Sequence, residues 1–156
     1  MSGTEPDLTV RPARRDDLPT IVGMLADDEL GATRERLEDP LPQAYEEAFA
    51  EIDTDPRNAF LVAERDGRIV ACLQLTFIPS LSFQGGERLQ IESVRVATDL
   101  RGHGIGAWVF NWAIERARER GCRMVQLTTN LARPDALRFY ERLGFQPSHT
   151  GMKLYL

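Results

Sequence analysis

A glycine-rich stretch, Val94 to Gly106, constrains this chain more than any other part of its sequence. It leads from an apolar, β-type segment into a strongly helical one, and three of its last five residues are glycines. Glycine lets the backbone take positive φ and approach a ligand closely. The N–H groups of such a turn, with an open helix N-terminus behind them, form a cradle for phosphate oxygens. The alternative is a helix start that needs small residues only for packing.

Two common phosphate-binding motifs do not explain this stretch. A P-loop requires a lysine after its glycines, and no lysine follows here. Gly102, Gly104 and Ala107 formally match a dinucleotide-binding pattern, but that pattern opens a chain of βαβ units and is followed about 20 residues later by an acid. Here most of the chain precedes the turn, and the next strand, Met124–Thr129, carries no acid.

The remaining pattern predicts a mixed α/β sheet with helices on both faces. Asp66-Gly67 between two apolar runs indicates a hairpin. Apolar residues at 89 and 91, then at 94 and 96, change parity, which favours a β-bulge over a strand buried on both faces. The expected strands are 8–13, 60–64, 69–77, 89–96, 124–129 and 149–156, and the expected helices begin near residues 18, 43, 104 and 134.

Two blocks of the sequence resemble the GCN5-related N-acetyltransferase (GNAT) superfamily. Arg101, Gly104 and Gly106 match its Arg/Gln-x-x-Gly-x-Gly/Ala signature. Asn130 and the segment 136–145 (ALRFYERLGF) are similar to its second conserved block. The resemblance implies one GNAT domain over 1–156, with a mostly antiparallel sheet of 6–7 strands and a splayed parallel pair at the coenzyme A site. It further implies a flexible tail at 1–6, acceptor-side helices at 14–56 and an acyl-CoA-binding core at 89–145.

The resemblance also implies the cofactor site. The backbone of Val94 to Val96 would follow the pantetheine arm, and the turn of the first block would hold the pyrophosphate. Asn130 would bind the pantetheine arm or, alternatively, cap the turn before Pro134. Arg133 would reach the 3′-phosphate or lie in solvent. The full expected set for acetyl-CoA is Val94, Arg95, Val96, Arg101, Gly102, His103, Gly104, Ile105, Gly106, Asn130, Arg133 and Tyr140.

Acetyl transfer to an amine needs a base for the ammonium group and an acid for the departing thiolate. The resemblance makes Glu92, on the bulged strand, the candidate base, unless it pairs with an arginine such as Arg95. Tyr140 is the candidate acid or sulfur contact, and as an aromatic it can also pack beside Phe139. The two cysteines, Cys72 and Cys122, lie in or beside apolar strands and form no metal-binding pattern. We therefore expect direct transfer in a ternary complex, without a metal.

Composition and charge narrow the partners. The net charge of −5 argues against nucleic-acid binding, and no apolar run approaches the length of a membrane span. Residues 1–94 hold 9 Lys/Arg against 19 Asp/Glu, whereas residues 95–156 hold 10 against 5. A basic half suits anionic CoA, and an acidic half suits a cationic acceptor.

We expect a cytoplasmic acetyltransferase, monomeric or homodimeric, acting on a primary amine of a small molecule or peptide. A protein lysine or N-terminal acetyltransferase and a non-catalytic acyl-CoA-binding module are the alternatives.

Overall fold

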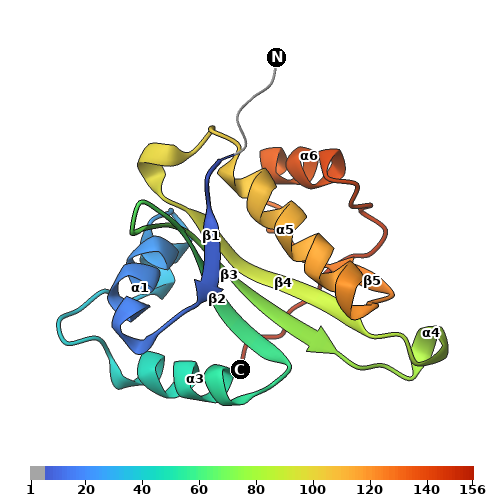
Figure 1. Cartoon of the computed structure of the whole chain (residues 1–156), viewed down its shortest axis with the longest axis horizontal. Helices are drawn as coiled ribbons and strands as arrows, with labels where there is room; N and C mark the ends of the chain where they lie inside the picture. The colour runs from blue at the N-terminus through green and yellow to red at the C-terminus, as the bar shows by residue number, and fades with distance from the viewer. Residues whose placement is uncertain (1–5) are drawn as a thin grey trace.

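The computed structural model describes residues 6–156, so the expected tail at 1–6 falls almost entirely outside the described residues. A five-stranded sheet with strand order β1-β2-β3-β4-β5 forms the centre of the molecule (Figure 1). Its strands are β1 (Thr9–Pro12), β2 (Asn58–Arg65), β3 (Arg68–Ile78), β4 (Arg88–Val96) and β5 (Met124–Gln126). Neighbouring strands are antiparallel except β4 and β5, which run parallel.

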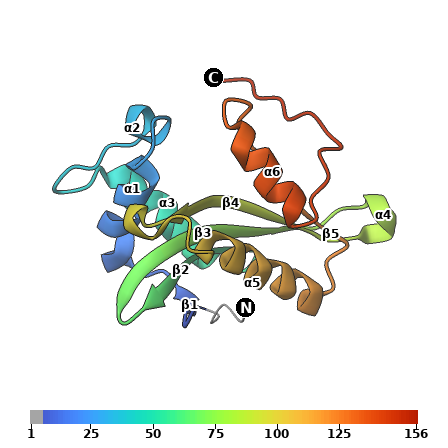
Figure 2. The ribbon, with the colours of Figure 1, turned by 90° about the horizontal axis from the view of Figure 1, so that it is seen from above.

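Helices cover both faces of this sheet (Figure 2). On one face α5 packs on a core that includes Leu73, Leu89 and Val109, and on the other α1 and α3 cover a smaller cluster around Val62 and Cys72. The longer helices are α1 (Leu18–Ala26), α3 (Gln43–Thr54), α5 (Ile105–Arg120) and α6 (Pro134–Arg142). The short helical segments are η1 (Arg15–Asp17), α2 (Gly31–Arg34), α4 (Ser82–Gly85) and η2 (Thr98–Leu100).

Two predicted local features are confirmed. Asp66 and Gly67 have φ of 52° and 74° and join β2 to β3, as expected of a two-residue hairpin with positive φ at both positions. The bulge in β4 is also present. Gln74 pairs with Glu92 whereas Cys72 pairs with Arg95, so β4 contains one extra residue in this interval. Ser93 lies inside it with φ of 54°.

The expectation of 6–7 strands is wrong, because the described residues form five. β5 ends at Gln126 rather than at Thr129, since only Arg88–Gln90 of β4 pair with it before the bulge redirects β4. The predicted last strand, 149–156, has no regular secondary structure and no partner strand among the described residues. Its large side chains are exposed, Met152 by 90% and Leu154 by 88%. Alternating apolar residues favour a strand, but a strand also needs a hydrogen-bonded neighbour.

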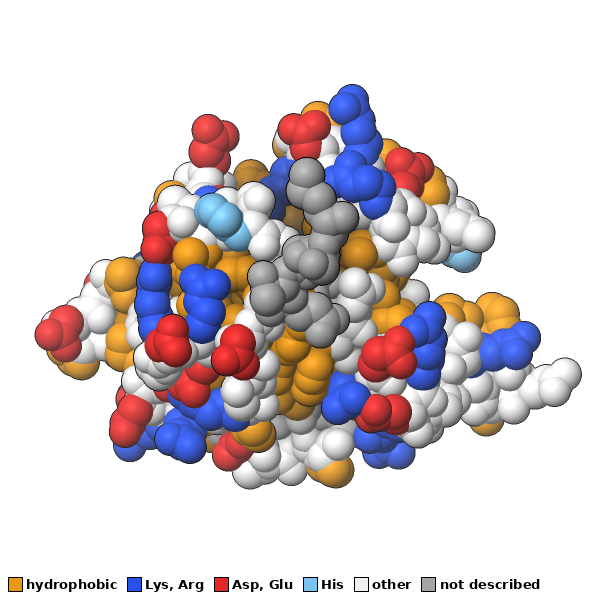
Figure 3. Space-filling view, turned by 45° about the horizontal axis from the view of Figure 1, so that its top comes forward, with side chains coloured by type: hydrophobic (Ala, Val, Ile, Leu, Met, Phe, Trp, Pro, Cys, Tyr) orange, Lys and Arg blue, Asp and Glu red, His pale blue; other side chains and the backbone are white. Residues whose placement is uncertain are grey.

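The surface carries charges of both signs. On the face shown in Figure 3, acidic and basic side chains alternate around apolar patches, so neither sign dominates that face. Among residues 6–156, no helix is long and apolar enough to cross a membrane. Within the same range, no group of three or more His, Cys, Asp or Glu side chains is placed to hold a metal ion.

Candidate active site

The turn between β4 and α5 has the geometry of an anion-binding cradle. Gly102 and Gly104 both have φ of +80°, and α5 begins directly after Gly104. Trp108 N donates to Gly104 O at 3.0 Å, so the N–H groups of the three residues before Trp108 belong to the open helix end. A cavity of about 240 Å³ opens at this point. It is lined by Val96, Leu100, Arg101, Gly102, Gly104, Ile105, Gly106, Ala107 and Phe139.

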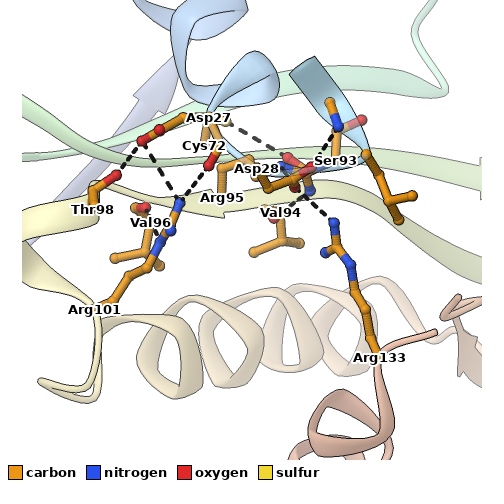
Figure 4. A network of polar contacts seen from close by, with 12 residues as sticks. Asp27, Asp28, Cys72, Ser93, Val94, Arg95, Val96, Thr98, Arg101 and Arg133 are labelled. Atoms are coloured by element: carbon orange, nitrogen blue, oxygen red, sulfur yellow. Dashed lines mark hydrogen bonds and ion pairs between the residues drawn. The ribbon is translucent and has the colours of Figure 1, made fainter. Parts of the chain in front are cut away.

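Arg101 lies at the edge of this cavity but is directed towards the end of α1. Its Nη2 donates to Asp27 O at 3.1 Å and lies 3.8 Å from Asp27 Oδ2, and its Nε donates to Val96 O at 3.3 Å (Figure 4). Thr98 Oγ1 donates to Asp27 Oδ2 as well. His103 is exposed, and its Nδ1 lies 3.1 Å from both Leu100 O and Arg101 O, which tightens the turn. Arg101 thus lines the cavity while its guanidinium is engaged with Asp27.

The β4 bulge brings Glu92 and Ser93 to the region where β4 and β5 separate. The side chain of Glu92 is exposed, as a base that exchanges protons with water requires, and Glu92 stands opposite Gln74 of β3. Ser93 O accepts a hydrogen bond from Cys72 Sγ at 3.6 Å. The alternative role for Glu92 was an ion pair with Arg95. Among the described residues Arg95 instead pairs with Asp28.

Tyr140 lies in an aromatic cluster beside α5. Its ring is in edge contact with Phe110, Phe139 and Phe145, at centroid distances of 5.3, 5.4 and 6.1 Å. Burial raises the pKa of the Tyr140 phenol, and the positive charges of Arg133 and Arg95 oppose this shift. Tyr140 thus packs against aromatic side chains, as predicted. Its hydroxyl is protonated and lies within the electrostatic influence of two arginines.

The carboxylate of Asp28 joins three segments that are far apart in the sequence. Its Oδ2 accepts from Arg133 Nη2 at 2.7 Å and lies 3.4 Å from Arg95 Nε, while its Oδ1 accepts from Gly31 N at 2.5 Å. Burial alone would raise the pKa of Asp28, but the Gly31 N–H and the two arginines outweigh it and hold the pKa below its ordinary value. In Figure 4 the Asp28 side chain reaches down from the end of α1 to lie between Arg95 and Arg133.

Asn130 occupies the turn that precedes α6. Its Oδ1 accepts from Ala132 N at 2.9 Å, and its backbone O accepts from Arg133 N at 2.9 Å. These contacts correspond to the capping alternative for Asn130. The same turn presents Arg133 to Asp28, on the α1 side of the sheet. Arg133 does not line the cavity at the glycine turn, and its predicted contact with a 3′-phosphate stays a prediction.

Neither cysteine has the environment of a nucleophile. Cys72 is fully buried, and this burial raises the pKa of its thiol to about 12. Cys122 is half-buried and donates to Glu87 Oε1 at 3.7 Å, and burial again raises the pKa of the thiol. Reactive cysteines need a lowered pKa, so both thiols stay protonated at neutral pH.

Sequence reasoning missed Asp27 and Asp28. They are two of eleven acids between residues 27 and 55, and nothing in their spacing distinguishes them from the others. Their partners lie 74 and 105 residues away in the chain. A larger, open cavity of about 640 Å³ borders Asp27 on the side of the β2–β3 turn, but its lining contains none of the predicted site residues.

Comparisons with known proteins identify the family of this chain. Residues 22–145 match the model of the "Acetyltransferase (GNAT) family". The chain is 36% identical over 109 residues to aminoalkylphosphonate N-acetyltransferase of Salmonella typhimurium, an alignment that covers 69% of each protein.

Two solved structures share the whole fold. The first, described as a transcriptional regulator from Bacillus halodurans C-125, is 53% identical with a TM-score of 0.92, over 96% of this chain and 99% of that one. An acetyltransferase from Trypanosoma brucei is 28% identical with a TM-score of 0.77, over 96% and 100%. The family match spans most of the chain and includes both the cradle and α6. The protein is therefore an N-acetyltransferase of the GNAT family.

Proposed function

We propose that the protein transfers an acetyl group from acetyl-CoA directly to a primary amine of a small molecule or peptide. The observation that carries this proposal is the cavity between Val96, the Gly102–Gly106 turn and Phe139. It joins an anion cradle to the end of β4 and to α6, the helix that bears Tyr140. Segment 89–145 would thus hold the acyl-CoA, and the helices of 14–56 would border the acceptor.

The residues of this site fit acetyl-CoA chemically. The turn supplies backbone N–H groups for a pyrophosphate, and Arg101 adds a guanidinium once it leaves Asp27. The bulge separates β4 from β5 and leaves strand N–H and C=O groups of Val94 to Val96 for an amide-containing arm. The glycines that line this cavity let the backbone come close to a bound ligand.

Glu92 is the proposed general base and Tyr140 the proposed general acid. The exposed Glu92 carboxylate takes the ammonium proton through a water molecule, and the free amine then attacks the thioester carbon. As the carbon–sulfur bond breaks, the Tyr140 hydroxyl gives its proton to the thiolate. Burial favours the protonated phenol, which keeps the acid loaded at neutral pH. Cys72 and Cys122 offer no acyl-enzyme route, because their thiols remain protonated.

The acceptor class is best matched by a small amine. The relative named above acts, by its name, on aminoalkylphosphonates, which are small primary amines. Four of the eleven acids between 27 and 55 form ion pairs with arginines, for example Glu46 with Arg15 and Glu38 with Arg36. The expected attraction of a cationic acceptor by this acidic segment is correspondingly reduced, and charge alone does not select the acceptor.

A thiol-release assay with acetyl-CoA and a panel of small amines and peptides tests the proposal. We expect Glu92→Gln and Tyr140→Phe each to lower kcat by about 10²-fold or more. Because the pKa of Tyr140 is raised, the wild-type rate should lose its acid only above about pH 10, and Tyr140→Phe should lack that alkaline limb. Tyr140→Phe keeps the aromatic contacts, so its Tm should match the wild type. Near-normal kcat for both variants at every pH would refute the two assignments.

A further inference from the structure

Two arginines beside the proposed reaction centre share a single carboxylate. Arg133 Nη2 is 2.7 Å and Arg95 Nε is 3.4 Å from the same oxygen, Asp28 Oδ2. Among the described residues, Asp28 is the only carboxylate that forms an ion pair with either arginine. The cluster therefore carries one uncompensated positive charge. The Asp28 and Arg95 side chains are only 18% and 16% exposed, so solvent screens their charges weakly, whereas Arg133 is 39% exposed and open to a ligand from solvent.

The hydrogen-bonding capacity of Arg95 is also underused. Its Nη1 donates to Val94 O at 2.9 Å, but its Nε is buried and has no hydrogen-bond partner among the described residues. A buried donor without a partner is unfavourable. A ligand acid that replaced Asp28 could approach Nε and satisfy it. Because a guanidinium presents a planar set of donors, carboxylate and phosphonate groups are its best-matched ligands.

The position of Arg95 and Arg133 favours a contact with the acceptor over a contact with the phosphates of CoA. Arg95 follows the bulge residue Ser93 by two positions, and its strand partner Cys72 faces the α1 side of the sheet. Arg133 is the residue before α6, the helix of Tyr140, and both arginines act on the Tyr140 phenol. The glycine cradle instead lies at the start of α5. The pair thus lies next to the bulge that carries Glu92 and at the start of the helix that carries Tyr140, the proposed base and acid.

We propose that Arg95 and Arg133 form a subsite for an acidic group on the acceptor, so that the enzyme acetylates primary amines that carry a phosphonate or a carboxylate. This inference rests on the proposed acetyl transfer and narrows its substrate. Asp28 fills the subsite in the absence of an acceptor and is displaced when the acid of the acceptor binds. The amine is then directed towards Glu92, while Arg133 is assigned to the acceptor and not to the 3′-phosphate.

Matched acceptors and matched variants test this subsite. The acceptors are 2-aminoethylphosphonate, β-alanine, the neutral ethanolamine and the cationic diamine ethylenediamine. Arg133→Gln should raise KM for the two acidic amines by about tenfold or more, while KM for ethanolamine changes by less than about twofold. The exposed Arg138→Gln on α6 is the control and should change neither. The two acids distinguish a phosphonate from a carboxylate preference.

A second variant keeps the test independent of any folding defect. Asp28→Asn retains the oxygen that accepts from Gly31 N but removes the competing charge, so KM for 2-aminoethylphosphonate should fall. Equal effects of Arg133→Gln on acidic and neutral amines, or a preference for ethylenediamine, would overturn the subsite. The subsite would also be overturned if Arg133→Gln weakened the binding of acetyl-CoA but not that of 3′-dephospho-acetyl-CoA. Arg133 would then contact the 3′-phosphate.

Binding without turnover separates the subsite from the proposed function. Calorimetry with 2-aminoethylphosphonate in the presence of CoA should show binding to the wild type and to Arg138→Gln but weakened binding to Arg133→Gln. If this pattern is found while no amine is ever acetylated, the transfer reaction is wrong and the subsite stands. If ethanolamine is acetylated but no acidic amine binds, the transfer stands and the subsite is wrong.

Discussion

A single residue, Ser93, carries the backbone conformation on which the active site depends. Its φ of 54° lies in the left-handed region, which costs a residue with a side chain about 1–2 kcal/mol. Serine bears this cost at the position where β4 gains its extra residue. The strain is therefore located where the strand must turn away from β5 and expose backbone groups.

We predict that Ser93→Val lowers the free energy of unfolding by about 1–2 kcal/mol, because a β-branched side chain is least tolerated at positive φ. Ser93→Gly should leave the free energy of unfolding within about 0.5 kcal/mol, since relief of strain offsets the larger entropy of the unfolded glycine. Urea unfolding of both variants measures the difference. Equal stability of the two would mean that the bulge does not hold Ser93 in this conformation.

At the scale of secondary-structure elements, the sequence predicted those features that depend on neighbouring residues alone. Gly104 and Gly121 bound α5 because both adopt the left-handed conformation, and the change in apolar parity revealed the bulge in β4. The last strand was mispredicted because alternation cannot say whether a neighbouring strand is within reach. Asp28 was missed because its partners, on β4 and before α6, are far away in the sequence and are brought close only by the fold.

An ion-pair network at the start of the chain shows how one element is held to the next. Arg11 of β1 donates to Asp17 Oδ2 at 2.7 Å and to Glu64 Oε1 of β2 at 2.7 Å. The hydrogen bonds from Arg11 hold the pKa of Asp17 below its ordinary value. The Asp17 side chain is only 13% exposed, so solvent does not fully screen the pair. The Arg11–Asp17 pair therefore contributes its full stability only while Asp17 is ionised.

We predict that Asp17→Asn lowers the free energy of unfolding at pH 7 by about 1–2 kcal/mol. The lowered pKa means that the stabilisation is complete above the unfolded value near pH 4 and is lost as pH falls through the lower folded value. The difference between wild type and variant should therefore shrink as pH falls below about 4. Urea unfolding across this range measures it, with the exposed Asp16→Asn as control. A difference that is independent of pH would contradict the assignment.

At the scale of the whole molecule, the uneven distribution of charge along the chain lets its two parts form ion pairs with each other. The acidic first part of the chain meets the basic second part at the end of α1, where Asp27 and Asp28 contact Arg101, Arg95 and Arg133. These contacts link the helices of one face to β4 and to the segment before α6. The three arginines of this contact outnumber the two aspartates by one, and this excess of positive charge lies beside the proposed reaction centre.

Binding of acetyl-CoA should stabilise the entire fold, because the cradle connects β4 to α5. At about 100 times its Kd, a ligand adds about 2.7 kcal/mol, which raises Tm by about 5–10 °C for a domain of this size. Gly104 and Gly121 provide a matched pair, since both have φ of +80° and open space where a Cβ atom would stand, but only Gly104 lines the cavity. Gly104→Val and Gly121→Val should lower Tm alike, yet only Gly104→Val should abolish the shift with acetyl-CoA. A shift with NADH in place of acetyl-CoA, or one that survives in Gly104→Val, would place the bound phosphates elsewhere.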